Sequence, residues 1–94
     1  MAAYFIVDVT VEDPVTYDEY RKLAGPTWDL YGVKILARGA METIEGDWQP
    51  QRLVILAFEN TEHFRRWYDS PEYRAAREFR FRASHARAVL LQGV

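Results

Sequence analysis

The first strand expected from this sequence is apolar on both of its faces, which restricts the folds that the chain can adopt. Residues 4–11 read YFIVDVTV and are rich in the β-branched and aromatic residues typical of strands. Successive residues of a strand point to opposite faces, yet apolar side chains occupy both alternating sets and Asp8 is the one charged residue among them. The pattern therefore predicts a central strand that is covered on both sides.

The remaining segments predict the order β-α-β-β-α-β. Further strands are expected over residues 33–45, with a bulge at Gly39, and over residues 53–58 and 86–92. Asp13 is suited to the start and Gly32 to the end of a first helix, which is expected to kink near Pro26. A second helix is expected to begin after residue 60 and to be interrupted at Ser70. This order is typical of a single ferredoxin-like α+β domain over residues 1–94, with a four-stranded antiparallel sheet and both helices on one face.

The number of helices is too small for the apolar strand surface. Two helices cover one face of such a sheet, and soluble monomers avoid leaving a large apolar face in water. The sequence therefore predicts a homodimer in which two copies pack their open sheet faces together around a two-fold axis.

The charge distribution and the rare residue types exclude several classes of partner. Residues 1–47 carry nine acidic and four basic side chains, whereas residues 48–94 carry five and eight. An acidic chain of this kind is not expected to bind nucleic acid. The longest apolar run, residues 53–58, is too short to cross a membrane, and no signal peptide is evident, so we expect a cytoplasmic protein. No cysteine and only two histidines are present, and we expect no metal or other cofactor.

Several segments resemble the DUF1330 family. They are Tyr17-x-x-Tyr20, Leu36-Ala37-Arg38-Gly39, Glu45-Gly46-Asp47-Trp48 and, most specifically, residues 67–73, which read WYDSPEY. The family in turn resembles the dimeric α/β-barrel superfamily, in which two ferredoxin-like subunits join sheet to sheet. The resemblance implies this fold and this dimer. It implies activity only weakly, because the family is named for having no assigned function. The superfamily includes cofactor-free monooxygenases, haem-binding enzymes and small isomerases, but their chemistry cannot be carried over because none of their catalytic motifs is recognisable here.

Two carboxylates are candidates for acid–base catalysis. Asp8 lies within an apolar strand, where it must be paired, hydrogen-bonded or protonated. It is either a general base or substrate anchor with a raised pKa, or the ion-pair partner of an arginine. Glu45 precedes the turn at Gly46 and is either a second catalytic carboxylate or a solvated turn residue.

Two arginines and one aromatic segment are candidates for ligand binding. Arg38 and Arg80 could hold an anion in a two-pronged contact, or pair with acidic residues of the chain or of its partner. Trp67, Tyr68 and Ser70 belong to the WYDSPEY segment. The aromatic residues among them are expected first in the core, where their polar ends could line a cavity between helices and sheet.

These candidates leave two functional hypotheses open. In the first, each subunit of the dimer binds a small anionic or aromatic organic molecule in a pocket between helices and sheet and acts as a ligand-binding protein or a cofactor-free enzyme. In the second, the dimer is a non-catalytic interaction or stress-response module.

Overall fold

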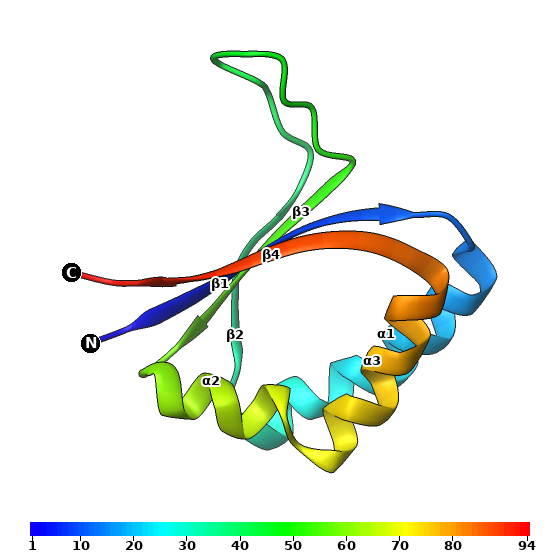
Figure 1. Ribbon diagram of the computed structural model, residues 1–94. Helices are drawn as coiled ribbons and strands as arrows, with labels where there is room; N and C mark the ends of the chain where they lie inside the picture. Colours follow the sequence, from blue (N-terminus) through cyan, green and yellow to red (C-terminus); the bar gives the residue numbers. More distant parts are fainter.

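The structure, a computed structural model, describes residues 1–94 and has the predicted order of elements (Figure 1). The elements are β1 (Ala3–Val11), α1 (Pro14–Tyr31), β2 (Lys34–Gly39), β3 (Arg52–Phe58), α2 (Thr61–Tyr68), α3 (Pro71–Ala83) and β4 (Ser84–Gln92). The strands form one antiparallel sheet in the order β2-β3-β1-β4, and the helices lie on one side of it. The ferredoxin-like α+β fold and the central position of β1 are confirmed.

Local sequence signals fix the ends of α1. The Asp13 side chain accepts hydrogen bonds from the Thr16 backbone N–H at 3.2 Å and from its hydroxyl at 2.6 Å, which caps the start of the helix. Gly32 ends it with a φ of +66°, in the left-handed region that glycine adopts without steric cost. Between these ends, α1 continues through Pro26 as one helix.

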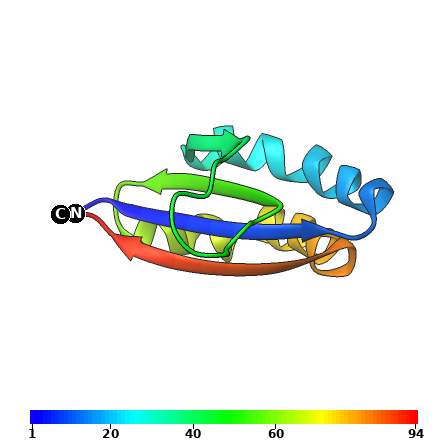
Figure 2. The same cartoon turned by 90° about the horizontal axis from the view of Figure 1, so that it is seen from above.

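The second strand is shorter than predicted. A strand was expected over residues 33–45 with a bulge at Gly39, whereas β2 ends at Gly39 and the shift in register lies between Ile35 and Ala37. Gly39 has a φ of +131° and pairs with Leu53, next to the first residue of β3, so the residues after it have no strand opposite them. Residues 40–51, here called the arm, project from the sheet on the side away from the helices (Figures 1 and 2).

The core is an aromatic cluster between the sheet and the helices. Trp67 of α2 is fully buried, and its ring centroid lies 4.0 Å from that of Tyr73 and 6.2 Å from that of Phe5. The Trp67 indole N–H donates to the Thr27 hydroxyl at 2.9 Å, and this hydroxyl donates to the Ala24 carbonyl at 2.6 Å. This buried chain of hydrogen bonds joins α2 to α1.

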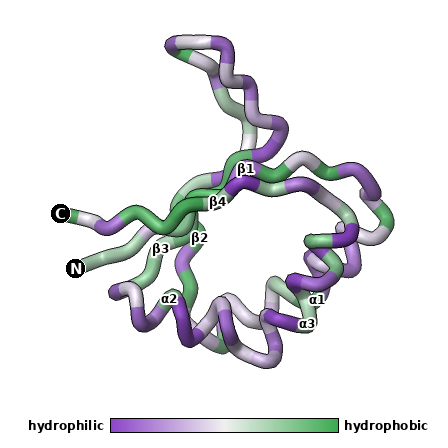
Figure 3. Tube along the Cα trace, in the orientation of Figure 1, coloured by the Kyte–Doolittle hydropathy of each residue, from purple (hydrophilic) through white to green (hydrophobic).

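The opposite side of the sheet, here called the open face, carries no helix and is apolar except toward one end, where the Asp8–Arg87 ion pair lies. Residues opposite each other in an antiparallel pair point to the same side, so the strand register places on this face Tyr4, Ile6, Leu53, Ile55, Ala57, Val89 and Leu91. Val89 and Leu91 are 60% and 56% exposed. Figure 3 shows hydrophobic positions along the crossing strands and hydrophilic positions spread over the helices.

We predict that Thr27→Val destabilises the fold by about 1–3 kcal/mol, because it leaves the buried Trp67 N–H without an acceptor. Thr10→Val, at an exposed position of β1, is the control with the same chemical change and is expected to stay within about 0.5 kcal/mol of the wild type. Urea denaturation followed by far-ultraviolet circular dichroism measures both values. Equal stabilities of the two variants would show that the hydrogen bond contributes nothing.

Candidate functional site

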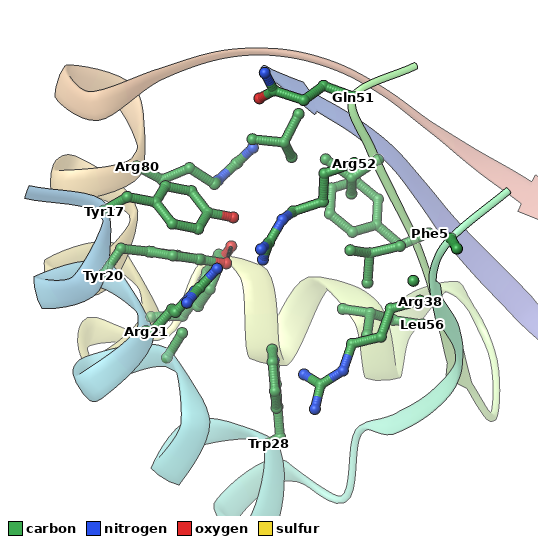
Figure 4. Close-up of a pocket in the computed structure, with 17 residues that line it drawn as sticks. Phe5, Tyr17, Tyr20, Arg21, Trp28, Arg38, Gln51, Arg52, Leu56 and Arg80 are labelled. Carbon is green, nitrogen blue, oxygen red and sulfur yellow. Dashed lines mark hydrogen bonds between the residues drawn. The ribbon is translucent and has the colours of Figure 1, made fainter. Parts of the chain in front are cut away.

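A cavity of about 710 Å³ lies between the helix-covered side of the sheet and the helices α1 and α3 (Figure 4). Side chains from the helices on one side and from β2 and β3 on the other point toward this shared space. The lining residues are mostly apolar or aromatic, with four arginines among them: Phe5, Val7, Val9, Tyr17, Tyr20, Arg21, Ala24, Trp28, Arg38, Gly39, Ala40, Gln51, Arg52, Val54, Leu56, Tyr73 and Arg80.

Two periodicities of the sequence bring these residues together. Tyr17, Tyr20, Ala24 and Trp28 follow one another at spacings of three and four, so they share one face of α1. On β1, alternate residues from Phe5 onward point to the helices, while the residues between them point to the open face. The cavity is therefore formed by one stripe of a helix and one face of a sheet.

Arg80 of α3 is the buried cation of the cavity. Its side chain is 4% exposed, none of the ion pairs in the structure includes it, and its Nε–H has no hydrogen-bond partner. The Trp28 indole N–H, in the same lining, also has none. Burying a charge without a counter-charge costs several kcal/mol, so this end of the cavity strongly favours a negative charge.

A pair of tyrosines lies beside Arg80. The hydroxyl oxygens of Tyr20 and Tyr73 are 2.9 Å apart and share one hydrogen bond. Burial is the largest cause that raises the pKa of both phenols above the usual value of 10.0, although the nearby Arg80 charge opposes the rise. Burial lowers the pKa of Arg80, but the coulombic interactions with the surrounding tyrosines together outweigh burial and raise this pKa above its usual value. All three groups therefore keep their protons at neutral pH, the arginine as a cation and the tyrosines as neutral donors.

The other three arginines of the lining are more exposed. Arg21 and Arg38 are exposed and Arg52 is half-buried. The guanidinium groups of Arg21 and Arg52 lie 5.3 and 5.5 Å from the centre of the Tyr17 ring, a cation–π distance. Arg21 also pairs with Asp18 at 3.6 Å, but the lining itself contains no carboxylate. The cavity is therefore electropositive from its exposed side to its buried end.

The structure separates the catalytic candidates from this cavity, whereas Arg38 and Arg80 line it. Asp8 points to the open face, where its Oδ2 lies 3.1 Å from Arg87 Nη2 and accepts a hydrogen bond from the Trp48 indole N–H at 3.2 Å. Glu45 lies in the arm and is exposed. A ligand in the cavity would thus contact the two predicted arginines of the same chain but neither predicted carboxylate.

The three candidates of the WYDSPEY segment do not line the cavity. The Trp67 side chain is held in the core by its bond to Thr27, and Tyr68 packs under the Arg77 guanidinium, 4.3 Å from its ring centre. Ser70 caps α3, its hydroxyl accepting from the Tyr73 N–H at 3.1 Å. Packing and helix capping account for this segment.

Sequence reasoning did not select the residues that complete the cavity. The spacing of Tyr17, Tyr20 and Trp28 places them on one helix face, but the spacing does not distinguish a packed core from the lining of a cavity. Arg21 follows Tyr20 directly in α1, and Arg52 is the first residue of β3. The sequence signal for these two residues is therefore a basic side chain next to the apolar residues with which α1 and β3 line the cavity. Which of the twelve basic residues share the cavity depends on the packing of α1 and α3 over the sheet.

The structure contains no group of three metal-ligating side chains close enough to hold an ion. None of its helices combines the length and apolar character needed to cross a bilayer.

Comparison with known families identifies the domain. The family model described as "Domain of unknown function (DUF1330)" matches residues 2–94. The chain has no significant match among curated proteins.

Solved structures show the same fold at low sequence identity. A protein of unknown function from Rhodopseudomonas palustris, RPA0582, is 18% identical with a TM-score of 0.81, over 99% of this chain and 82% of the other. SnoaB, a cofactor-independent oxygenase from Streptomyces nogalater, is 13% identical with a TM-score of 0.71, over 99% and 93%. A dimeric protein of unknown function with a ferredoxin-like fold, from Bacteroides fragilis, is 14% identical with a TM-score of 0.66, over 98% and 96%.

The tyrosine pair predicts a loss of stability at alkaline pH. Because the pKa of Tyr20 is raised well above 10.0 in the folded chain, the folded state binds more protons than the unfolded state once the pH exceeds 10. The free energy of unfolding is then expected to be pH-independent with respect to this group below pH 10 and to fall as the pH rises further. Tyr20→Phe should flatten this fall. Urea denaturation at pH 8, 9.5 and 10.5 measures it, and an unchanged slope in the variant would contradict the assignment.

Proposed function

Because the chain belongs to the DUF1330 family, to which no function is assigned, we propose its function from the site itself: the cavity between α1, α3 and the sheet binds a small organic anion. The observation that carries this proposal is Arg80, a buried arginine without a carboxylate partner in an otherwise apolar and aromatic lining. A bound anion would supply the missing counter-charge. The volume of about 710 Å³ lies within the usual range of small-molecule sites.

The exposed arginines suit the entry of such a ligand. Arg21, Arg38 and Arg52 add positive charge on the more exposed side of the cavity, and charge of one sign around a concave site raises the association rate of oppositely charged ligands. The effect of solvent-exposed arginines weakens with salt, whereas a contact with buried Arg80 is screened much less. Entry and retention thus depend on different arginines.

Binding without acid–base catalysis is the function that the residues support best. SnoaB performs an oxygenation without a cofactor, and a cofactor-free reaction would be possible for the anion bound here. The carboxylates expected to act as acid or base, Asp8 and Glu45, do not line the cavity, and the polar side chains that do are arginines, tyrosines, Trp28 and Gln51. We therefore propose that the protein binds and orients its ligand.

An anionic fluorescent dye tests this function. 8-Anilinonaphthalene-1-sulfonate is expected to bind with increased fluorescence, and Arg80→Met is expected to weaken binding at least tenfold, about 1.4 kcal/mol. Methionine conserves much of the side-chain volume, and replacing a buried charge by an apolar residue is often tolerated. Arg74→Met, an exposed position of the same helix, is the matched control and should bind like the wild type. Equal affinities of the two variants would overturn the proposal.

We also propose that two copies of the chain pair through their open faces. Val89 and Leu91 of this face are exposed in the single chain and its other apolar side chains are partly exposed, and large apolar patches of this kind mark interaction sites. A structural relative from Bacteroides fragilis is dimeric. A second copy would cover the face with an identical apolar surface, as a two-fold axis requires.

Light scattering tests the dimer. The wild type is expected at about 22 kDa, twice the 11.0 kDa of the chain. Val89→Glu should shift it to the monomer mass, because the charge would be buried between the sheets. Val15→Glu makes the same change at an exposed valine of α1, on the helix side, and should leave the dimer intact. A wild-type mass near 11 kDa at micromolar concentration would disprove the dimer.

A further inference from the structure

The buried end of the cavity offers donors that match the two oxygens of one carboxylate. Arg80 provides N–H donors in a planar fork. Tyr20 and Tyr73 have two hydroxyl protons between them, and their mutual hydrogen bond uses one. The second proton is left for a ligand beside Arg80. One guanidinium and one phenolic O–H can thus bind the two oxygens of a single planar anion.

The balance of charge favours a monoanion over a dianion. Arg80 is the buried cation of the lining, while Arg21 and Arg38 are exposed and Arg52 is half-buried. One negative charge is compensated by Arg80, but a second negative charge at the same end would remain buried without a partner, at a cost of several kcal/mol. A phosphate monoester carries about two charges above pH 7 and is therefore a poorer match than a carboxylate.

The rest of the lining suits a flat ring system. Phe5, Tyr17 and Trp28 present aromatic side chains, and Leu56 adds aliphatic surface (Figure 4). Aromatic pairs in offset or edge-to-face contact contribute about 0.5–1.5 kcal/mol beyond the burial of area. A ligand body that is aromatic would gain from several of these rings at once.

Resting on the proposed function, we infer that the ligand is an aromatic monocarboxylate, with its carboxylate between Arg80 and the Tyr20–Tyr73 pair and its ring against Phe5, Tyr17 and Trp28. This inference defines the chemical class of the ligand and its orientation in the cavity.

Isothermal titration calorimetry at pH 8 with four probes tests the class. 2-Naphthoate is the monoanion, 2-naphthamide its neutral analogue, 2-naphthyl phosphate the dianion, and acetate a carboxylate without a ring. 2-Naphthoate is expected to bind at least tenfold more tightly than each of the other three. Arg80→Met should remove this preference over 2-naphthamide, and Arg74→Met should retain it.

The outcomes separate the class of ligand from the proposed function. If 2-naphthyl phosphate binds as tightly as 2-naphthoate and Arg80→Met weakens both, the cavity binds anions but the carboxylate assignment is wrong. If acetate matches 2-naphthoate, the aromatic part is wrong. If 2-naphthamide binds as tightly as 2-naphthoate, anion recognition itself is disproved along with the inference. If no probe binds while the anionic dye still binds in a manner that depends on Arg80, the inferred ligand class alone is wrong.

The tyrosine pair gives a second test that depends on orientation. Tyr20→Phe or Tyr73→Phe alone leaves one hydroxyl, no longer engaged by its neighbour, that can donate to the carboxylate. The double variant removes both donors. We expect a loss of affinity for 2-naphthoate below threefold in each single variant and of about tenfold or more in the double variant. If the losses of affinity in the two single variants add up to the loss in the double variant, or if the double variant loses no affinity, the proposed orientation is wrong.

Discussion

The architecture depends on a sheet that is apolar on both faces while the chain has helices for only one. β1 forces this situation, because it is paired on both edges and carries apolar residues in both alternating sets. On one side, Phe5 packs against the aromatic rings of α2. On the other, Ile6 lies among apolar residues of β3 and β4 with no helix above them. Burial of the first side stabilises the subunit, and the second side is the one through which we propose that two copies pair.

The cavity exists because the aromatic cluster fills only part of the space between helices and sheet. Trp67 of α2 and Tyr73 near the start of α3 pack tightly against each other. Farther along, Tyr17 and Trp28 of α1 and Arg52 of β3 line the cavity from opposite sides. Interiors are normally packed without large voids. The void lined by arginines and tyrosines is therefore the feature on which the proposed ligand site rests.

The fold could be predicted from local patterns, and the site only in part. Asp13, Gly32 and Ser70 act on the backbone within a few residues, so their effect on helix ends can be derived from the sequence. Arg80 was identified as an anion-binding candidate, but its neighbours Tyr20 and Tyr73 lie 53 residues apart in the chain and meet only through the packing of α1 on α3. The end of β2 was misplaced because the pairing available to it depends on where β3 begins.

The Asp8–Arg87 pair forms in one register of the sheet, and this register also decides which side chains face the cavity and which face the open side. Asp8 is the one charged residue of β1, and the register places Arg87 of β4 directly opposite it. A shift of one residue would turn every side chain of β1 to the other face, which would put the Asp8 carboxylate on the helix side and Phe5 on the open face. A carboxylate there would neutralise arginines of the cavity and remove the reason for an anion to bind. The register that places Asp8 beside Arg87 on the open face is thus the same register that keeps a carboxylate out of the cavity.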